Sequence, residues 1–426
     1  MLRSAGHRLF SVQQLISKMA LIYLLSVSFM ILSVLAANLI PNDLILKNLR
    51  LSLPAENYSV IFGSTQTDQW TECVAATVGI GRNTSELGLI RKSLLSPMLN
   101  NCEIAWNFLK DGTGEPNNYW RYWHGTQIIM RPALAITSVL NIRALTFFLF
   151  VSSFMYAFLT LYHHGLRLPA LALFVGLFFV HLQSALFVLP HAADWIIGFL
   201  ACGWVITKLN GNVPISLNTF SCAFFLIGLL SAFFGLLNNP LVSLTIPLFG
   251  VFSAVAFQKE KDAVGSLVLV LAATFFWFIG YVVSWSTKWL LTLFFVDGVF
   301  SEVSRLAKFW MAGSDGAIEG TWSNLVIAVG RQNRIGGIIA IIFLILSFIP
   351  LVRFLRTVGR NWADLTSFVF ICALPLIWLA ALKTHTIVHG WFVSAQLYIS
   401  FVMVFSLLFT SWALKSSLFT RVRPNL

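Results

Sequence analysis

The stretch KMALIYLLSVSFMILSVLAANLI, from Lys18 to Ile40, decides the fold class. Its only charge is Lys18 at its start, and its length matches the ~20 apolar residues with which an α-helix crosses a bilayer. No convincing small-residue cleavage site follows it. We therefore expect a first transmembrane helix that also directs the chain to the membrane.

The composition of the whole chain agrees with this stretch. Of its 426 residues, 58% are hydrophobic and 10% are charged, and the mean hydropathy is +0.82. A soluble domain carries about 25% charged residues. The apolar runs are long and unbroken, which excludes the short alternating strands of a β-barrel. The sequence predicts an all-α polytopic membrane protein with a large folded external loop after the first helix.

About ten apolar segments are predicted to cross the membrane, at residues 18–40, 142–163, 169–189, 193–209, 215–236, 241–257, 264–285, 336–356, 363–383 and 391–414. Lys288–Val296 is apolar but too short to cross alone, so we expect it at the interface or in a re-entrant segment. The predicted order is a cytoplasmic N-terminus (1–17), the first span (18–40), an external loop with an interfacial helix (41–141), spans two to seven (142–285), a second external loop (286–335), spans eight to ten (336–414) and a cytoplasmic tail (415–426).

The formal net charge of +12 favours a topological interpretation over nucleic-acid binding. Lys and Arg dominate the segments predicted to be cytoplasmic, as the positive-inside rule requires. Both termini are therefore expected in the cytoplasm of a multi-pass protein of the bacterial inner, or plasma, membrane. Cys73 and Cys102 share the first external loop and would pair if that loop faces an oxidising compartment.

The first loop contains the acidic element TDQWTEC, in which Asp68 and Glu72 stand four residues apart. That spacing places both carboxylates on one face of a helix. They would share a proton, with one acting as a general base, or bind a divalent cation through oxygen. The alternative is a solvated helix face. Asp43, just past the first span, would meet a substrate at the membrane surface or serve as a helix N-cap.

The stretch NNYWRYWHGTQIIMRP, from Asn117 to Pro132, ends the first loop. Its tyrosines and tryptophans fit an interfacial aromatic belt. Arg121 and Arg131 present planar guanidinium groups that match phosphate oxygens, and His124 adds a group that titrates near neutral pH. We predict that these three residues bind a lipid phosphate.

A second polar cluster is predicted on the same side of the membrane. The turn LKTHTIVHGWF carries Lys383, His385 and His389, and the turn PHAADW carries Asp194. These residues would bind a diphosphate or a sugar, although a snorkelling lysine with interfacial histidines is the alternative. The spans hold almost no charge, whereas coupled transporters carry ionisable groups at mid-membrane depth. The pattern favours chemistry on a membrane-anchored substrate.

This layout of one span, a large acidic external loop and many closely spaced spans resembles the GT-C class of membrane glycosyltransferases. The resemblance covers most of the chain as topology, together with TDQWTEC, YWRYWHGTQIIMRP and KTHTIVHGWF. It implies a polyprenyl-phosphate-linked sugar donor, a glycan or lipid acceptor, and a first-loop carboxylate, Asp68 or Asp43, as base or metal-associated acid. No DxD motif and no adjacent DD or DE pair follows the first span. The alternatives are a glycan polymerase or acyltransferase, or a flippase or transporter of a lipid-linked glycan.

Overall fold

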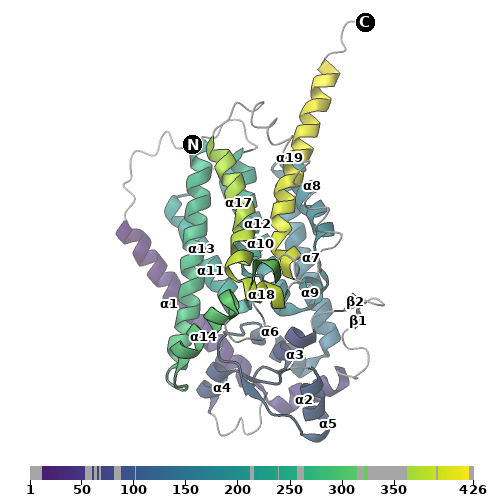
Figure 1. Ribbon diagram of the computed structural model, residues 1–426, viewed down its shortest axis with the longest axis vertical. Helices are drawn as coiled ribbons and strands as arrows, with labels where there is room; N and C mark the ends of the chain where they lie inside the picture. Colours follow the sequence, from purple (N-terminus) through teal and green to yellow (C-terminus); the bar gives the residue numbers. More distant parts are fainter. Residues whose placement is uncertain are drawn as a thin grey trace.

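The computed structural model describes residues 12–52, 60–61, 65–66, 69–80, 88–100, 102–211, 215–237, 239–256, 263–313, 321–324, 362–389 and 392–421, and this part of the chain is almost entirely helical (Figure 1). Seven of the described helices are long and apolar enough to cross a membrane. They are α1 (Val12–Asn38), α7 (Val139–His163), α10 (Leu189–Asn210), α11 (Leu217–Phe234), α13 (Ala263–Thr292), α17 (Trp362–Ala381) and α19 (Val393–Arg421). The protein is an all-α, multi-pass membrane protein.

The third, sixth and eighth predicted spans are not among these seven helices. The sixth corresponds to α12 (Pro240–Ala256), whose 17 residues are all buried, as expected of a helix that is apolar on every side and lies inside a bundle. The eighth, 336–356, lies outside the described residues. The third, 169–189, is not one helix but three pieces: α8 (Arg167–Gly176), the 3₁₀ turn η1 (Leu177–Phe179) and α9 (Gln183–Phe187).

Helix α19 compensates for the break in the third segment. The backbone N–H of His181 donates to Ser394 Oγ at 3.1 Å, and the hydroxyl of Tyr398 donates to the carbonyl of Leu173 at 2.6 Å. A backbone group without a partner inside a membrane protein is costly. The break is therefore tolerated because α19 offers polar side chains beside it.

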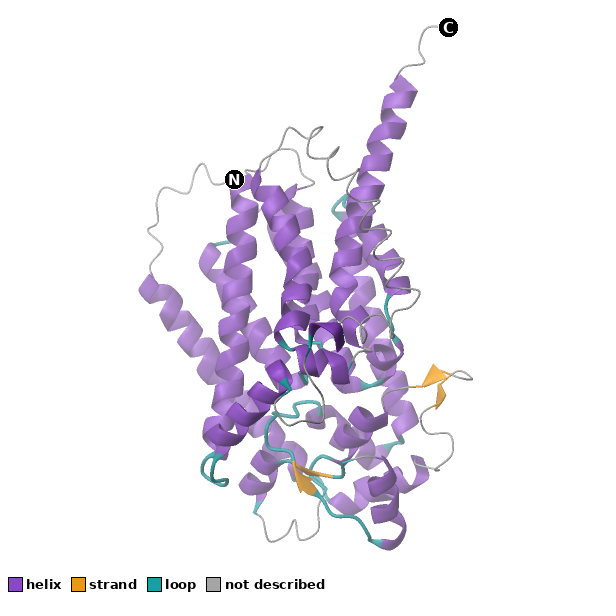
Figure 2. Ribbon diagram, viewed as in Figure 1, coloured by secondary structure: helices purple, strands orange, loops and turns teal. Residues whose placement is uncertain are grey.

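The segment between α1 and α7 forms a folded layer at one end of the bundle, which we call the loop layer (Figure 1). The beginning of α1 and the end of α19 lie toward the opposite end. A disulfide between Cys73 and Cys102, with a Cα–Cα distance of 5.3 Å, ties two of its helices together. Figure 2 shows two short antiparallel strand pairs among its helices. The elements are α2 (Asn42–Ser52), β1 (Val60–Ile61), β2 (Thr65–Gln66), α3 (Gln69–Thr77), α4 (Leu89–Leu95), β3 (Pro97–Met98), α5 (Cys102–Asp111), β4 (Asn117–Asn118) and α6 (Gln127–Ile136).

The prediction for Lys288–Val296 is wrong for its first half. These residues form neither a separate interfacial segment nor a re-entrant one. Helix α13 continues through Lys288 to Thr292, so the second predicted external loop, 286–335, begins inside a helix. Two further short helices, α14 (Val299–Ala312) and α18 (Lys383–Val388), lie near the loop layer. They complete the surroundings of the site described below.

Helices α11 and α13 approach each other through two glycines. A Cβ at Gly228 would lie 2.0 Å from the carbonyl oxygen of Trp277, and a Cβ at Gly280 would lie 2.1 Å from that of Phe225. Small residues permit such close approach between membrane helices. We expect Gly228→Ala and Gly280→Ala each to destabilise the protein by about 1–3 kcal/mol, as overpacking does.

The measurement is the unfolding temperature of the detergent-solubilised protein. Ser152→Ala, on an exposed position of α7, is the control and should melt like the wild type. Unchanged melting of both glycine variants would contradict the close helix contact.

Candidate functional site

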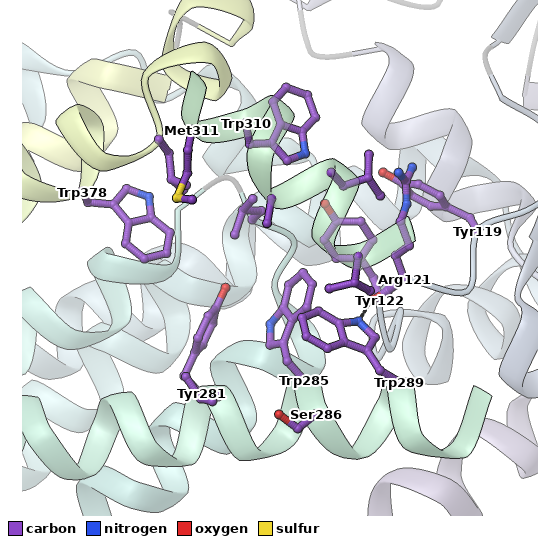
Figure 3. A pocket seen from close by; sticks show the side chains of 16 residues that line it. Tyr119, Arg121, Tyr122, Tyr281, Trp285, Ser286, Trp289, Trp310, Met311 and Trp378 are labelled. Atoms are coloured by element: carbon purple, nitrogen blue, oxygen red, sulfur yellow. Dashed lines mark hydrogen bonds between the residues drawn. The ribbon is translucent and has the colours of Figure 1, made fainter. Parts of the chain in front are cut away.

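A cavity of about 280 Å³ lies where the loop layer meets the ends of α13 and α17 (Figure 3). We call it the aromatic pocket, because tyrosines and tryptophans dominate its walls. Arg121 is the one charged side chain among its lining residues. The walls are formed chiefly by Tyr119, Arg121 and Tyr122 of the loop layer, Tyr281, Trp285 and Trp289 of α13, Val303, Leu306, Trp310 and Met311 of α14, and Trp378 of α17.

Helical spacing explains why these aromatic residues meet. Tyr281, Trp285 and Trp289 follow one another at intervals of four residues, which places them along one face of α13. The indole N–H of Trp289 donates to the backbone carbonyl of Arg121 at 3.2 Å. This bond fastens the loop-layer turn that carries Arg121 to the helix that forms the pocket wall.

Arg121 supplies the positive charge of the pocket. Its guanidinium carbon lies 4.8 Å from the centre of the Tyr119 ring, and it forms no ion pair with any carboxylate of the described residues. Burial raises the pKa of Tyr119 and raises that of Tyr122 further, so both phenols stay protonated at neutral pH. A half-buried guanidinium beside two phenol groups can bind phosphate oxygens with its planar array of N–H groups.

His124 supports the pocket from behind and does not line it. It adopts a left-handed backbone conformation with φ of 55°, and its Nε2 lies 2.9 Å from the carbonyl oxygen of Tyr119. The backbone N–H of Gly125 donates to the carbonyl of Phe233 at 2.8 Å, and a Cβ at Gly125 would lie 2.5 Å from that oxygen. The His-Gly pair therefore forms a tight turn that presses the loop layer against the end of α11.

Arg131 does not reach the aromatic pocket. It is buried, and its guanidinium donates at 2.9 Å to the carbonyls of Ala37, Ile40 and Val78 and to the side-chain oxygen of Asn42. These acceptors lie at the end of α1, at the start of α2 and just after α3. The predicted role in phosphate binding is replaced by a structural one, since four of its five N–H groups are already used.

The predicted acids of the first loop are not gathered at the pocket. Glu72 is buried in α3, and its two carboxylate oxygens accept from Arg143 at 2.8 and 2.6 Å. This bidentate pair leaves Glu72 unsuited to act as a base. Asp43 is exposed in the first turn of α2, where a negative charge favours the helix. Asp68 lies outside the described residues.

Asp194 is not on an external turn, contrary to the prediction. Helix α10 begins at Leu189 and buries Asp194, whose Oδ1 accepts from the Ser231 hydroxyl at 2.6 Å. Pro190 lies in the first turn of α10, where proline is compatible with a helix start and does not mark a turn.

The predicted cluster near the end of the chain lies behind Trp310. The rings of His385 and His389 are 4.7 Å apart, and their centres lie 5.0 and 5.8 Å from that of Trp310. Lys383 Nζ lies 4.9 Å from the ring of Trp322. Among the described residues, no group of three or more His, Cys, Asp or Glu side chains is placed to hold a metal ion.

Two buried histidines predict acid sensitivity. Burial lowers the pKa of His124 and of His385 to about 3, from about 6.5 in an unfolded chain. Between these values the unfolded state binds more protons, so stability falls as the pH falls. Between pH 7 and pH 5, we expect each histidine to lower the free energy of unfolding by about 2 kcal/mol.

The measurement is the unfolding temperature as a function of pH for the wild type, His124→Asn and His385→Asn. In each variant, the unfolding temperature should fall less steeply than in the wild type as the pH drops below 6.5. His163→Asn, at the exposed end of α7, should keep the whole slope. An unchanged slope in both buried-site variants would refute this assignment.

The sequence analysis does not predict several residues of the pocket, namely Tyr281, Trp285, Trp289, Trp310 and Trp378. The four-residue spacing on α13 is visible in the sequence, but the predicted end of the seventh span at residue 285 cuts through it. Of the predicted binding residues, Arg121 alone lines the pocket, while His124, His385 and His389 support its walls. Comparison of the chain with protein-family models, with curated proteins and with solved structures finds no match.

Proposed function

We propose that the protein is a membrane glycosyltransferase that takes a sugar from a polyprenyl-phosphate donor and passes it to a cell-envelope glycan or lipid acceptor. The observation that carries this proposal is Arg121, a cation without an ion-pair partner among the described residues, in a pocket that is otherwise aromatic and apolar. Ligand sites typically combine such apolar walls with a few placed polar groups.

The position of the pocket suits a substrate anchored in the membrane. It lies between the loop layer and the last turns of α13, where a lipid phosphate would meet the protein (Figure 3). Val282 belongs to the pocket and is exposed, as is Phe278 one turn away on the same helix. These residues offer a lateral path for the polyprenyl chain.

The Cys73–Cys102 disulfide supports a reaction on the outer face. Disulfides persist in oxidising compartments and are rare in the cytosol. In our proposal the loop layer faces the outside of a bacterial plasma membrane, and both termini face the cytoplasm. Of the three predicted acids, Asp68 is our first candidate for the base that deprotonates the acceptor hydroxyl, and Asp43 is the alternative.

The test is sugar transfer from a polyprenyl-phosphate-linked hexose by the protein reconstituted in liposomes. We expect Arg121→Gln to lower kcat/KM at least about tenfold, since charge-assisted hydrogen bonds are the strong ones. Arg167→Gln, at the start of α8, should keep the wild-type rate. Wild-type transfer by Arg121→Gln would refute the assigned phosphate site, and donor binding without transfer would favour a carrier of lipid-linked glycans over an enzyme.

A further inference from the structure

Two buried polar atoms at the aromatic pocket, the hydroxyl of Tyr281 and the indole N–H of Trp285, have no partner within hydrogen-bond geometry. The two groups interact with each other, but the phenolic O–H has no acceptor. Tyr281 as a whole is 7% exposed, and Figure 3 shows its hydroxyl pointing into the pocket beside the Trp285 indole. Buried donors without acceptors are costly. A bound molecule with an oxygen at this position would satisfy both donors.

Of these two donors, Tyr281 is the further from Arg121 along α13. The Trp289 indole holds the backbone of Arg121, and Tyr281 precedes Trp289 by eight residues. Eight residues of α-helix rise about 12 Å. The pocket therefore has two polar positions, one beside Arg121 near the loop layer and one beside Tyr281 deeper in the bundle.

The two positions differ in charge. Arg121 provides a cation at the first position. At the second, no lining residue is charged. An anion is attracted to Arg121 and gains nothing at Tyr281. The oxygen that Tyr281 and Trp285 bind is therefore uncharged.

The size of the pocket further restricts which molecules can bind in it. Its volume of about 280 Å³ is near the lower end of the range of ~300–1,000 Å³ for small-molecule sites. A pocket of this size suits a phosphorylated monosaccharide. The indole and phenol rings of the walls can pack on the C–H faces of a pyranose, while the two donors bind its hydroxyl oxygen.

We propose that the aromatic pocket holds the sugar of the donor, with the phosphate on Arg121 and a neutral sugar oxygen on Tyr281 and Trp285. This inference rests on the proposed function for the identity of the donor. It adds an orientation, with the sugar directed inward along α13 and the lipid chain leaving sideways. It also adds a specificity, because an acidic sugar would bring a carboxylate into an aromatic part of the pocket that has no charged lining residue.

The test is equilibrium binding of four labelled ligands to the protein in lipid nanodiscs: farnesyl phosphate, farnesyl phosphoglucose, farnesyl phosphoglucuronate and decyl glucoside. The wild type should bind farnesyl phosphoglucose about tenfold more tightly than farnesyl phosphoglucuronate. Tyr281→Phe and Trp285→Phe should each weaken binding of both glucosides about two- to tenfold and leave farnesyl phosphate unchanged. Arg121→Gln should weaken the phosphates and leave decyl glucoside unchanged. Tyr162→Phe, at the exposed end of α7, is the matched control for Tyr281→Phe.

The outcomes separate this inference from the proposed function. Equal binding of the neutral and acidic sugars, or equal effects of Tyr281→Phe on farnesyl phosphate and its glucoside, would overturn the inference while phosphate binding at Arg121 still stands. If no phosphate binds but decyl glucoside binding depends on Tyr281, the proposed donor is wrong and the sugar site is supported.

Discussion

Replacing Arg131 by methionine is expected to loosen the packing of the loop layer and its attachment to the end of α1. The substitution removes four hydrogen bonds and leaves the buried carbonyls of Ala37 and Val78 without this donor. A hydrogen bond to a charged group contributes about 1.5–3 kcal/mol. Even with partial compensation by water, we expect a loss of at least about 4 kcal/mol.

The effect can be measured as the unfolding temperature together with limited proteolysis of the loop layer. Arg131→Lys should recover only part of the loss, because an ammonium group cannot reproduce the planar guanidinium array. Arg121→Met is the matched control, since Arg121 has no comparable bonds to helix ends, and it should melt like the wild type. Wild-type melting and protease resistance of Arg131→Met would show that these bonds do not hold the layer.

Breaking the buried ion pair between Glu72 and Arg143 should have the second large effect. The pair joins the loop layer to α7, and its side chains are only 4% and 10% exposed. Removing one partner leaves a buried charge without compensation, which costs about 3–5 kcal/mol. We therefore expect Glu72→Gln and Arg143→Met each to lower the unfolding temperature strongly.

A double-mutant cycle isolates the pair. The double variant, Glu72→Gln with Arg143→Met, should lose less free energy of unfolding than the two single variants added together, because no charge is left unpaired. The exposed pair of Glu302 and Arg305 on α14 provides the control, and breaking it should cost no more than about 1 kcal/mol. Additive losses at Glu72 and Arg143 would mean that their contact contributes no coupling energy.

Hydropathy predicts the long membrane helices well, because each of them satisfies its backbone internally and needs only apolar side chains. The third span defeats this reasoning. Its residues are apolar, but the helix breaks between Gly176 and Gln183, and the partners that permit the break come from Ser394 and Tyr398. Composition within a window carries no information about side chains more than 200 residues away.

The candidate site is harder to predict for a related reason. Lys288 marks a natural end for the seventh predicted span, yet in the structure it is buried within α13. Its Nζ donates to the carbonyl of Leu94 at 2.7 Å and lies 5.6 Å from the ring of Trp123. A carbonyl of the loop layer thus stabilises Lys288 within α13, at a position where hydropathy alone predicts the end of the helix. Arg131 shows the same ambiguity, since a guanidinium suits carbonyl oxygens as well as phosphate oxygens.

The break between α8 and α9 also has a consequence for the order of assembly. Residues 167–187 are synthesised long before α19, and neither α8 nor α9 is long enough to cross a bilayer alone. Phe179 packs against Phe401 and Phe405, so apolar contacts as well as hydrogen bonds wait for the last helix. We expect this early segment to be among the last to reach its native form. Chains truncated before Val393 should leave it open to protease or to chaperones while the helices before it are already inserted.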